Sequence, residues 1–351
     1  MGYRILGSVG RTLIAAGVLL LAFAAFQLWG TNIEEGRRQE DLAGSLAQSV
    51  GTDLAGADEG AKADALADTL QGRTGGEAPA IPVGEGLGVI EIPKIGVKKI
   101  IVEGVNKDDL RKGPGHYPGT PLPGQPGNAA IAGHRTTYGA PFNRIDELVP
   151  GDEIVVFTPQ GKFTYQVIPP PDGAWKVIER GPGWFSVRPD QSTVLAATTD
   201  NRLTLTACHP KLSAEQRIIV VAKLIDTPAA TTSSTSSVPV TTNSDNVGSN
   251  GNTNGSTDAT DAIVEAPHAA PAEAFDAGFR GDDGALLPAI LWGLAAAFIW
   301  FAAWLVRTVL TRDEGDVRWR RRFWVWMAFL PVFAVPLWFS FFYIDRFLPS
   351  F

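Results

Sequence analysis

The stretch LTLTACHPKLSAEQRIIVVAKL, from Leu203 to Leu224, predicts two strands joined by a short turn. Its first part alternates apolar and small residues, and its last part is rich in β-branched residues, as strands are. Cys208, the only cysteine of the chain, ends the first strand, and Arg217 opens the second. A lone cysteine is most often a small buried residue, so other residues must decide whether this one is reactive.

Five further short runs before this stretch share the strand pattern, and Gly, Pro and Asp separate them. They are LGVIEIP, VKKIIVEG, NAAIAGH, DEIVVFT and KFTYQVI. Two other stretches, KDDLRKGPG and APFNRIDELVP, predict short helices or single helical turns. No alternation of strands with long helices appears. We therefore expect one mainly β domain over residues 87–226, either a closed barrel or a sandwich.

Three apolar, uncharged stretches outside this domain are long enough to cross a membrane as helices. They cover residues 12–30, 285–306 and 323–344. The first is favoured as an uncleaved signal anchor over a cleaved signal peptide, because bulky residues follow its small-residue pattern Ala22-Phe23-Ala24. The prolines of the third are tolerated in membrane helices.

Basic residues beside these stretches predict their orientation, because cytoplasmic segments are enriched in arginine and lysine. Arg4 and Arg11 place residues 1–11 in the cytoplasm, and the arginine-rich loop of residues 307–322 should lie there too. The expected location is the plasma membrane, crossed three times. The N-terminus is then cytoplasmic, and the β domain and the tail of residues 345–351 are extracellular.

Two segments flank the β domain. Residues 31–86 are rich in Ala, Gly and Asp and have little to bury, so a flexible extracellular tether is expected. Residues 227–284 hold a Ser/Thr/Asn-rich stretch typical of a low-complexity linker. The formal net charge of −7 does not favour a nucleic-acid partner.

The candidate chemistry lies in Cys208 and in the histidines of the β domain. There is no CxxC, no HxxxH and no second cysteine, so neither a metal nor another cofactor is expected. A cysteine nucleophile needs a base, usually histidine, and donors for an oxyanion, which an arginine fork provides. His134 ends one predicted strand, so it can meet Cys208 and Arg217 at one rim of a barrel. Taken singly, each of the three is more often a buried or solvated structural residue.

The surroundings of these residues resemble the sortase family. The family pattern is a TLxTC-type strand ending in the nucleophile, with an arginine on the next strand. It is matched here by Thr204-Leu205-Thr206-Ala207-Cys208 and by Arg217, with Ala207 a mild departure. The segment HYPGTPLPGQPGNAAIAGHRTTYGAPF around His134, and the pair His209-Pro210, are similar to class E sortases of high-GC Gram-positive bacteria. The resemblance covers the whole inferred β domain.

This resemblance implies a closed eight-stranded β-barrel with short helices and a membrane-anchored transpeptidase that attaches proteins to the cell wall. Cys208 would cleave a sorting signal between Thr and Gly and hold a thioester. His134 would be general acid and base, and Arg217 would position the substrate and stabilise the oxyanion. The partners implied are secreted proteins that carry the signal and an amine of the peptidoglycan precursor.

The similarity to class E sortases further implies a preference for an LAxTG-like signal over LPxTG. Tyr117 takes the place of a tyrosine associated with that preference, although it could equally be a packing aromatic in a Pro/Gly loop. Thr206 and His209 border the nucleophile and are further candidates for substrate binding. His209 adjoins Cys208 on the chain, so it cannot easily turn onto the thiol as a base.

Two other functions stay open. The first is a cysteine peptidase or amidase of the cell wall. Papain-like enzymes place cysteine before histidine, whereas His134 precedes Cys208, and an L,D-transpeptidase would have arginine where Pro210 stands. The second is a non-catalytic barrel that binds the wall. Substitution of Cys208 distinguishes these possibilities, because binding would survive it.

Overall fold

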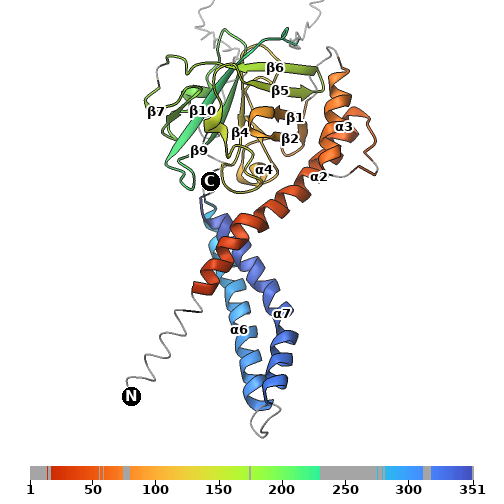
Figure 1. Ribbon diagram of the computed structural model, residues 1–351, viewed down its shortest axis with the longest axis vertical. Coiled ribbons are helices and arrows are strands. Elements are labelled where there is room, and N and C mark those ends of the chain that lie inside the picture. The colour runs from red at the N-terminus through yellow and green to blue at the C-terminus, as the bar shows by residue number, and fades with distance from the viewer. Residues whose placement is uncertain are drawn as a thin grey trace, which may run out of the picture.

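A computed structural model shows a β-barrel at one end of a long stalk of helices (Figure 1). The N-terminal helix runs from the stalk onto the side of the barrel, and the C-terminus lies where the stalk meets the barrel (Figure 1). The structure describes Ile14, Phe275, Phe279 and residues 17–54, 56–57, 59–73, 80–173, 175–229, 281–310 and 318–349.

The barrel is a single sheet that closes on itself. Its strand order is β6-β5-β1-β2-β3-β4-β9-β10, and β10 pairs with β6 through Ala222–Leu224 to complete the ring. The closed eight-stranded barrel implied by the resemblance is therefore confirmed. The strands are β1 Gly86–Ile92, β2 Val97–Glu103, β3 Gly115–His116, β4 Asn128–Ala132, β5 Glu153–Thr158, β6 Gly161–Val167, β9 Arg202–His209 and β10 Gln216–Leu224.

Two strands lie outside the ring and were not predicted. β7 (Val177–Arg180) and β8 (Trp184–Val187) form a hairpin whose second strand pairs with the first half of β10. The residues of β7 are mostly exposed, so no apolar alternation marks them in the sequence. β10 is therefore shared along one edge, first by β8 and then by β6.

The short helices lie in the loops between strands. α4 (Lys107–Leu110) and the 3-10 turn η3 (Ile145–Glu147) fall in the two stretches predicted to be helical. Asn106 caps α4 by accepting from two backbone N–H groups, a favoured arrangement at a helix start. The other 3-10 turns of the described residues are η2 Pro93–Ile95 and η4 Ser192–Leu195 between strands, and η5 Asp283–Ala285 after the last strand.

The flexible tether expected over residues 31–86 is wrong for two stretches of it. α2 (Thr31–Val50) continues the π-helical turn η1 (Phe26–Gly30), and α3 (Glu59–Gln71) folds back beside it. Both helices pack on the outside of β1 and β2 around a shared apolar cluster. The helix side chains larger than alanine in the cluster follow a spacing of four residues within each helix: Leu42, Leu46 and Val50 in α2, and Leu66 and Leu70 in α3. Ala, Gly and Asp dilute this stripe in the sequence, which is why composition alone hid it.

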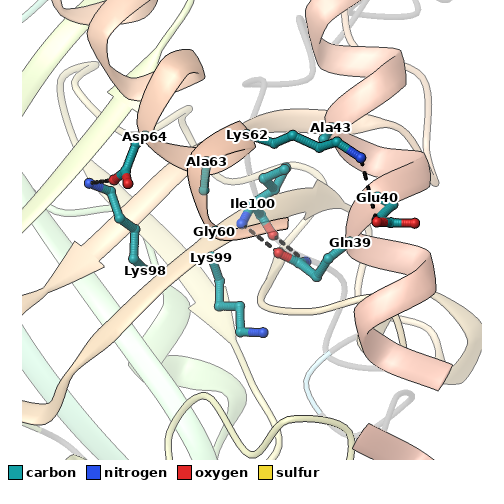
Figure 2. Close-up of a pocket in the computed structure, with 10 residues that line it drawn as sticks. All are labelled: Gln39, Glu40, Ala43, Gly60, Lys62, Ala63, Asp64, Lys98, Lys99 and Ile100. Carbon is teal, nitrogen blue, oxygen red and sulfur yellow. Dashed lines mark hydrogen bonds and ion pairs between the residues drawn. The ribbon is translucent and has the colours of Figure 1, made fainter. Parts of the chain in front are cut away.

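Gln39 of α2 adds a polar anchor to this packing. Its side-chain amide donates to the Ile100 carbonyl at 3.0 Å and accepts from the Ile100 N–H at 2.9 Å (Figure 2). The same nitrogen donates to the Lys112 carbonyl at 2.6 Å. The Gln39 amide thus forms the same pair of hydrogen bonds with the β2 backbone that a residue of a neighbouring strand would form. Ion pairs of Lys62 with Glu40 and of Lys98 with Asp64 line the polar cleft above it (Figure 2).

The C-terminal helices form an antiparallel pair. α6 (Leu286–Leu310) and α7 (Arg318–Phe347) pack through Trp292 and Phe339, whose ring centroids are 4.8 Å apart. Within the described residues, three helical stretches are long and apolar enough to cross a membrane: Gly17–Val50, Asp283–Val306 and Met327–Phe347. These match the three predicted spans where the structure describes them. Most of the predicted linker, residues 230–274, and residues 311–317 of the basic loop lie outside the described residues.

Candidate active site on the outer face of the barrel

Strand β9 has two faces with different surroundings. Leu203, Leu205 and Ala207 belong to the apolar cluster inside the barrel. Successive side chains of a strand point to opposite faces, so Thr206 and Cys208 face outward. Cys208 accordingly belongs to a second cluster, on the outside of the sheet. The thiol is therefore not part of the barrel core.

The sheet register brings the three predicted catalytic residues to one place. Arg217 of β10 lies directly opposite Cys208 of β9. β4 runs parallel to β9 with Ala132 beside Thr206, and the Gly133 N–H donates to the Thr206 carbonyl at 3.0 Å. His134 follows Ala132 by two residues, and Cys208 follows Thr206 by two residues, so these two residues lie at the same level. All three meet at the same end of the β4-β9-β10 surface, as expected from strands ending there.

Each of these side chains is held within the fold. His134 and Cys208 are 0% exposed and Arg217 is 1% exposed. The Arg217 guanidinium donates to the carbonyls of Ala214 at 2.9 Å and of Gln216 at 3.0 Å. Gly133 precedes His134 because a Cβ there would lie 2.6 Å from the Phe142 ring. Close packing against Phe142 therefore constrains the backbone directly before His134.

Two phenylalanines from the C-terminal part of the predicted linker, residues 227–284, cover this site. The Phe279 ring packs edge-on to His134, at 5.9 Å between centroids, and lies 4.5 Å from the Arg217 guanidinium carbon. Phe275 stacks on Tyr117 at 6.4 Å, and its carbonyl accepts from the Tyr117 hydroxyl at 3.4 Å. Both phenylalanines are buried. Sequence analysis missed them, although two aromatic residues four apart in PAEAFDAGF were a signal.

Tyr117 and Thr206, both candidates for substrate binding, contact each other. Their hydroxyl oxygens are 2.9 Å apart, and both side chains are buried in the outer face. Tyr117 stands just beyond β3, which pairs with β4, so it lies on the same surface as His134. The pair forms a polar contact beside the apolar residues of the outer cluster.

His209, the third such candidate, is placed differently. It follows Cys208 and so points to the other face of β9. Arg135 donates to its Nδ1 at 2.7 Å. Because arginine only donates, Nδ1 is the acceptor and Nε2 carries the proton toward Glu179, 3.3 Å away. His209 is thus engaged with Arg135 and Glu179, away from the thiol, and its location gives no support to substrate binding.

Arg135 is a buried residue of the site that sequence analysis missed. Besides His209, it contacts the Cys208 carbonyl at 3.4 Å and the Asp146 carboxylate at 2.9 Å. It therefore ties the chain around the thiol to the loop after His134. Its only signal in the sequence was its position directly after His134.

The described residues contain no group of three or more His, Cys, Asp or Glu side chains that could hold a metal ion. His116 is engaged instead with Glu103, at 2.7 Å from Nδ1, and with the Pro121 carbonyl, at 3.0 Å from Nε2. The chemistry available at the outer face is that of a thiol, an imidazole and a guanidinium.

Comparison with known proteins places this region in one family. Residues 90–225 match the family model described as Sortase domain. The chain is 32% identical to Sortase SrtE1 of Streptomyces coelicolor over 230 residues, which is 62% of this chain and 57% of that protein. It therefore spans little more than half of that relative. It is 29% identical to Sortase D of Bacillus subtilis over 201 residues, which is 56% of this chain and 86% of that protein.

Among solved structures, the chain is similar to sortase E from Streptomyces avermitilis. The identity is 34%, the match covers 41% of this chain and 91% of that chain, and the TM-score is 0.34.

Proposed function

Since the region of residues 90–225 belongs to the sortase family, we propose that this protein is a class E-type cysteine transpeptidase that joins secreted proteins to the cell wall. Cys208 is the nucleophile, His134 the general acid and base, and Arg217 the oxyanion donor. The observation that carries the proposal is the register of β4, β9 and β10. It aligns these three side chains on the outer face of the barrel, where a peptide can approach.

The reaction runs in two halves. Cys208 Sγ attacks the carbonyl carbon of Thr in the sorting signal, and the Arg217 guanidinium stabilises the developing oxyanion. The Thr–Gly bond breaks as His134 gives its proton to the leaving glycine amine, which leaves a thioester on Cys208. An amine of the peptidoglycan precursor then attacks the thioester and loses a proton to His134. The thiolate departs, and the enzyme is restored.

A peptide substrate must displace Phe275 and Phe279, because both rings are buried against residues that the chemistry uses. Their presence also supports peptide binding at this face. The surface accepts apolar side chains and, through Tyr117, bonds a backbone carbonyl. An extended LAxTG-like signal would offer groups of the same kind. We propose that the Tyr117–Thr206 pair contributes to a preference for LAxTG over LPxTG.

The proposed location is the plasma membrane, crossed by all three apolar helices. The arginines near the N-terminus and between the second and third spans favour a cytoplasmic side there. The barrel then lies outside the cell, where secreted proteins and wall precursors meet. Residues 87–226 are the catalytic domain, and residues 227–284 join it to the second span.

The test uses the full chain in detergent micelles, because α2, α3 and α7 all contact the barrel. The protein is incubated with LAxTG and LPxTG peptides and an amine, and products are identified by mass. We expect a thioester on Cys208, cleavage after Thr, and a product joined to the amine, with LAxTG preferred. Hydrolysis alone at every amine concentration would indicate a peptidase. Binding without cleavage would indicate a wall-binding barrel.

A further inference from the structure

The C-terminal end of α7 is fixed to the barrel next to His134. Asp345 of α7 forms an ion pair with Arg111, which follows α4, at 3.1 Å, and both side chains are buried. Lys107 of α4 donates to the carbonyls of Arg346 and Leu348, each at 2.6 Å. A cation on the last carbonyls of a helix is favourable because those groups have no partner within the helix. The barrel and the end of α7 are thus joined by a polar, buried contact, here called the joint.

Tyr138 connects this joint to the proposed general base. Its hydroxyl donates to the same Asp345 oxygen, Oδ2, that pairs with Arg111. Its ring lies 5.3 Å from the His134 ring, tilted by 36°. The Arg111 guanidinium lies 5.3 Å from the Tyr138 ring centroid. Asp345 and Arg111 therefore hold the hydroxyl and the ring of a residue that packs against the imidazole.

The backbone of Tyr138 needs this support. Its φ is 52°, in the left-handed region that a bulky residue rarely adopts. Its N–H donates to Thr31 Oγ1 at 3.3 Å, and the next N–H, of Gly139, donates to Asn32 Oδ1 at 2.9 Å. A conformation of this kind persists only where its surroundings impose it. Here the start of α2 holds the backbone and the end of α7 holds the side chain.

We propose that Asp345 acts through Tyr138 as a positioning residue for His134, so that the α6–α7 pair is part of the catalytic machinery as well as an anchor. The proposal rests on the function proposed above for His134. Proton transfer in both half-reactions requires the imidazole in one orientation, and small displacements of a catalytic group slow the chemical step. The neighbouring ring limits the orientations that the imidazole can take.

The charges around Tyr138 suit this role. Burial, and then the Asp345 carboxylate, raise the pKa of Tyr138, so its hydroxyl stays a donor to Asp345. The other charged groups that act on it are Arg111, which follows α4, and Glu34 of α2. The hydrogen bond that fixes the ring thus persists over the pH range in which a histidine titrates.

The experiment compares variants of the full chain in micelles. Asp345→Asn removes the carboxylate charge, and Tyr138→Phe keeps the ring but removes the hydroxyl. Asp282→Asn is the matched control, because Asp282 pairs with Arg346 at the same joint and makes no described contact with Tyr138. Two readouts are taken for each variant: kcat and KM with an LAxTG peptide, and the alkylation rate of Cys208, the only thiol, against pH.

We expect Asp345→Asn and Tyr138→Phe each to lower kcat by roughly 10- to 100-fold, with KM little changed. The double variant should be no slower than the slower single variant, because the two residues act in series. The pH profile of Cys208 alkylation should shift in both. Asp282→Asn should match the wild type in both readouts.

The proposal is overturned if Tyr138→Phe and Asp345→Asn behave like Asp282→Asn, or if all three lose activity only in proportion to a lower Tm. Should Asp345→Asn fail to fold because Arg111 loses its partner, Tyr138→Phe decides alone, since it leaves that ion pair in place. A wild type that cleaves no peptide would refute the proposed function. The alkylation profiles would still show whether Asp345 acts on the imidazole beside Cys208.

Discussion

The inner and outer faces of strand β9 have different surroundings, although their residues alternate along the chain. The inner side chains, Leu203, Leu205 and Ala207, fill the barrel. The outer ones, Thr206 and Cys208, are as deeply buried, but they lie under Tyr117 and the Phe275 and Phe279 cover. Burial alone therefore does not separate the residues of the barrel core from those proposed to be reactive. What separates them is what covers them: a closed barrel on one side, and two rings from a distant segment on the other.

The largest effect is expected from Cys208→Ala. Thioester formation should fall below detection, because no other thiol exists in the chain. The Tm should stay within a few degrees of the wild type, since the change removes one heavy atom outside the barrel core. Mass spectrometry of the enzyme after incubation with peptide measures the first effect, and a thermal melt the second. Cleavage at a comparable rate by this variant would show that the thiol is structural.

Leu205→Ala, three residues before Cys208, should lower the stability of the protein and leave its activity unchanged. Truncating a buried leucine in a closed core lowers the free energy of unfolding by about 2–5 kcal/mol. The folded fraction should keep the wild-type kcat, because Leu205 points away from the site. Denaturant unfolding gives the free energy, and activity per folded molecule is its control. A large loss of kcat in fully folded protein would mean that the two faces are not independent.

Replacing both covering rings, Phe275→Ser with Phe279→Ser, should expose the outer face. Burial of a phenylalanine contributes about 1.5–3 kcal/mol, so removing both should raise the alkylation rate of Cys208 by tenfold or more. Peptide turnover at low substrate should rise as well. Phe298→Ser serves as a control, because that α6 ring is already 71% exposed in the structure. Unchanged alkylation would show that the thiol is reached without moving the cover.

The smallest effect is expected from Tyr117→Phe, which removes a hydroxyl and keeps the ring. The Thr206 hydroxyl loses its partner, at a cost of about 1 kcal/mol. If the pair helps to select the second position of the signal, the ratio of kcat/KM for LAxTG over LPxTG should change by roughly fivefold. Thr206→Val should change it in the same direction. An unchanged ratio with a lower Tm would assign both residues to packing only.

Whether a feature could be predicted from the sequence depended on how far apart along the chain its interacting residues lie. Strand patterns are local, so seven of the eight barrel strands were predicted, and α4 and η3 fall in the two stretches predicted to be helical. β3 was not predicted, because a strand of two residues has no alternation to detect. The alignment of Cys208 with Arg217 was also accessible, because a short turn sets the register of adjacent strands. The roles proposed for these residues came from the resemblance to sortases and await the tests above.

Longer-range contacts were not predictable. Tyr138 and Asp345 are 207 positions apart, and Gln39 and Ile100 are 61 apart. No local pattern marks either pair. The docking of α2 was concealed because small residues surround its leucine stripe, and the hairpin of β7 and β8 because its exposed strand lacks alternation. His209 shows the converse limit, since closeness to Cys208 on the chain put it on the opposite side of the sheet.

The continuous helical stretch from Gly17 to Val50 fixes the distance between its apolar start and the barrel that carries the proposed catalytic site. At 1.5 Å per residue its 34 residues extend about 50 Å, and about 20 of them suffice for a bilayer. The remainder lies along the barrel. The contacts of Lys107 and Arg111 hold the end of α7 against the barrel as a second fixed attachment. If the enzyme proposed above crosses a membrane through this helix, it would process only those bonds that are presented at this distance from the lipid surface.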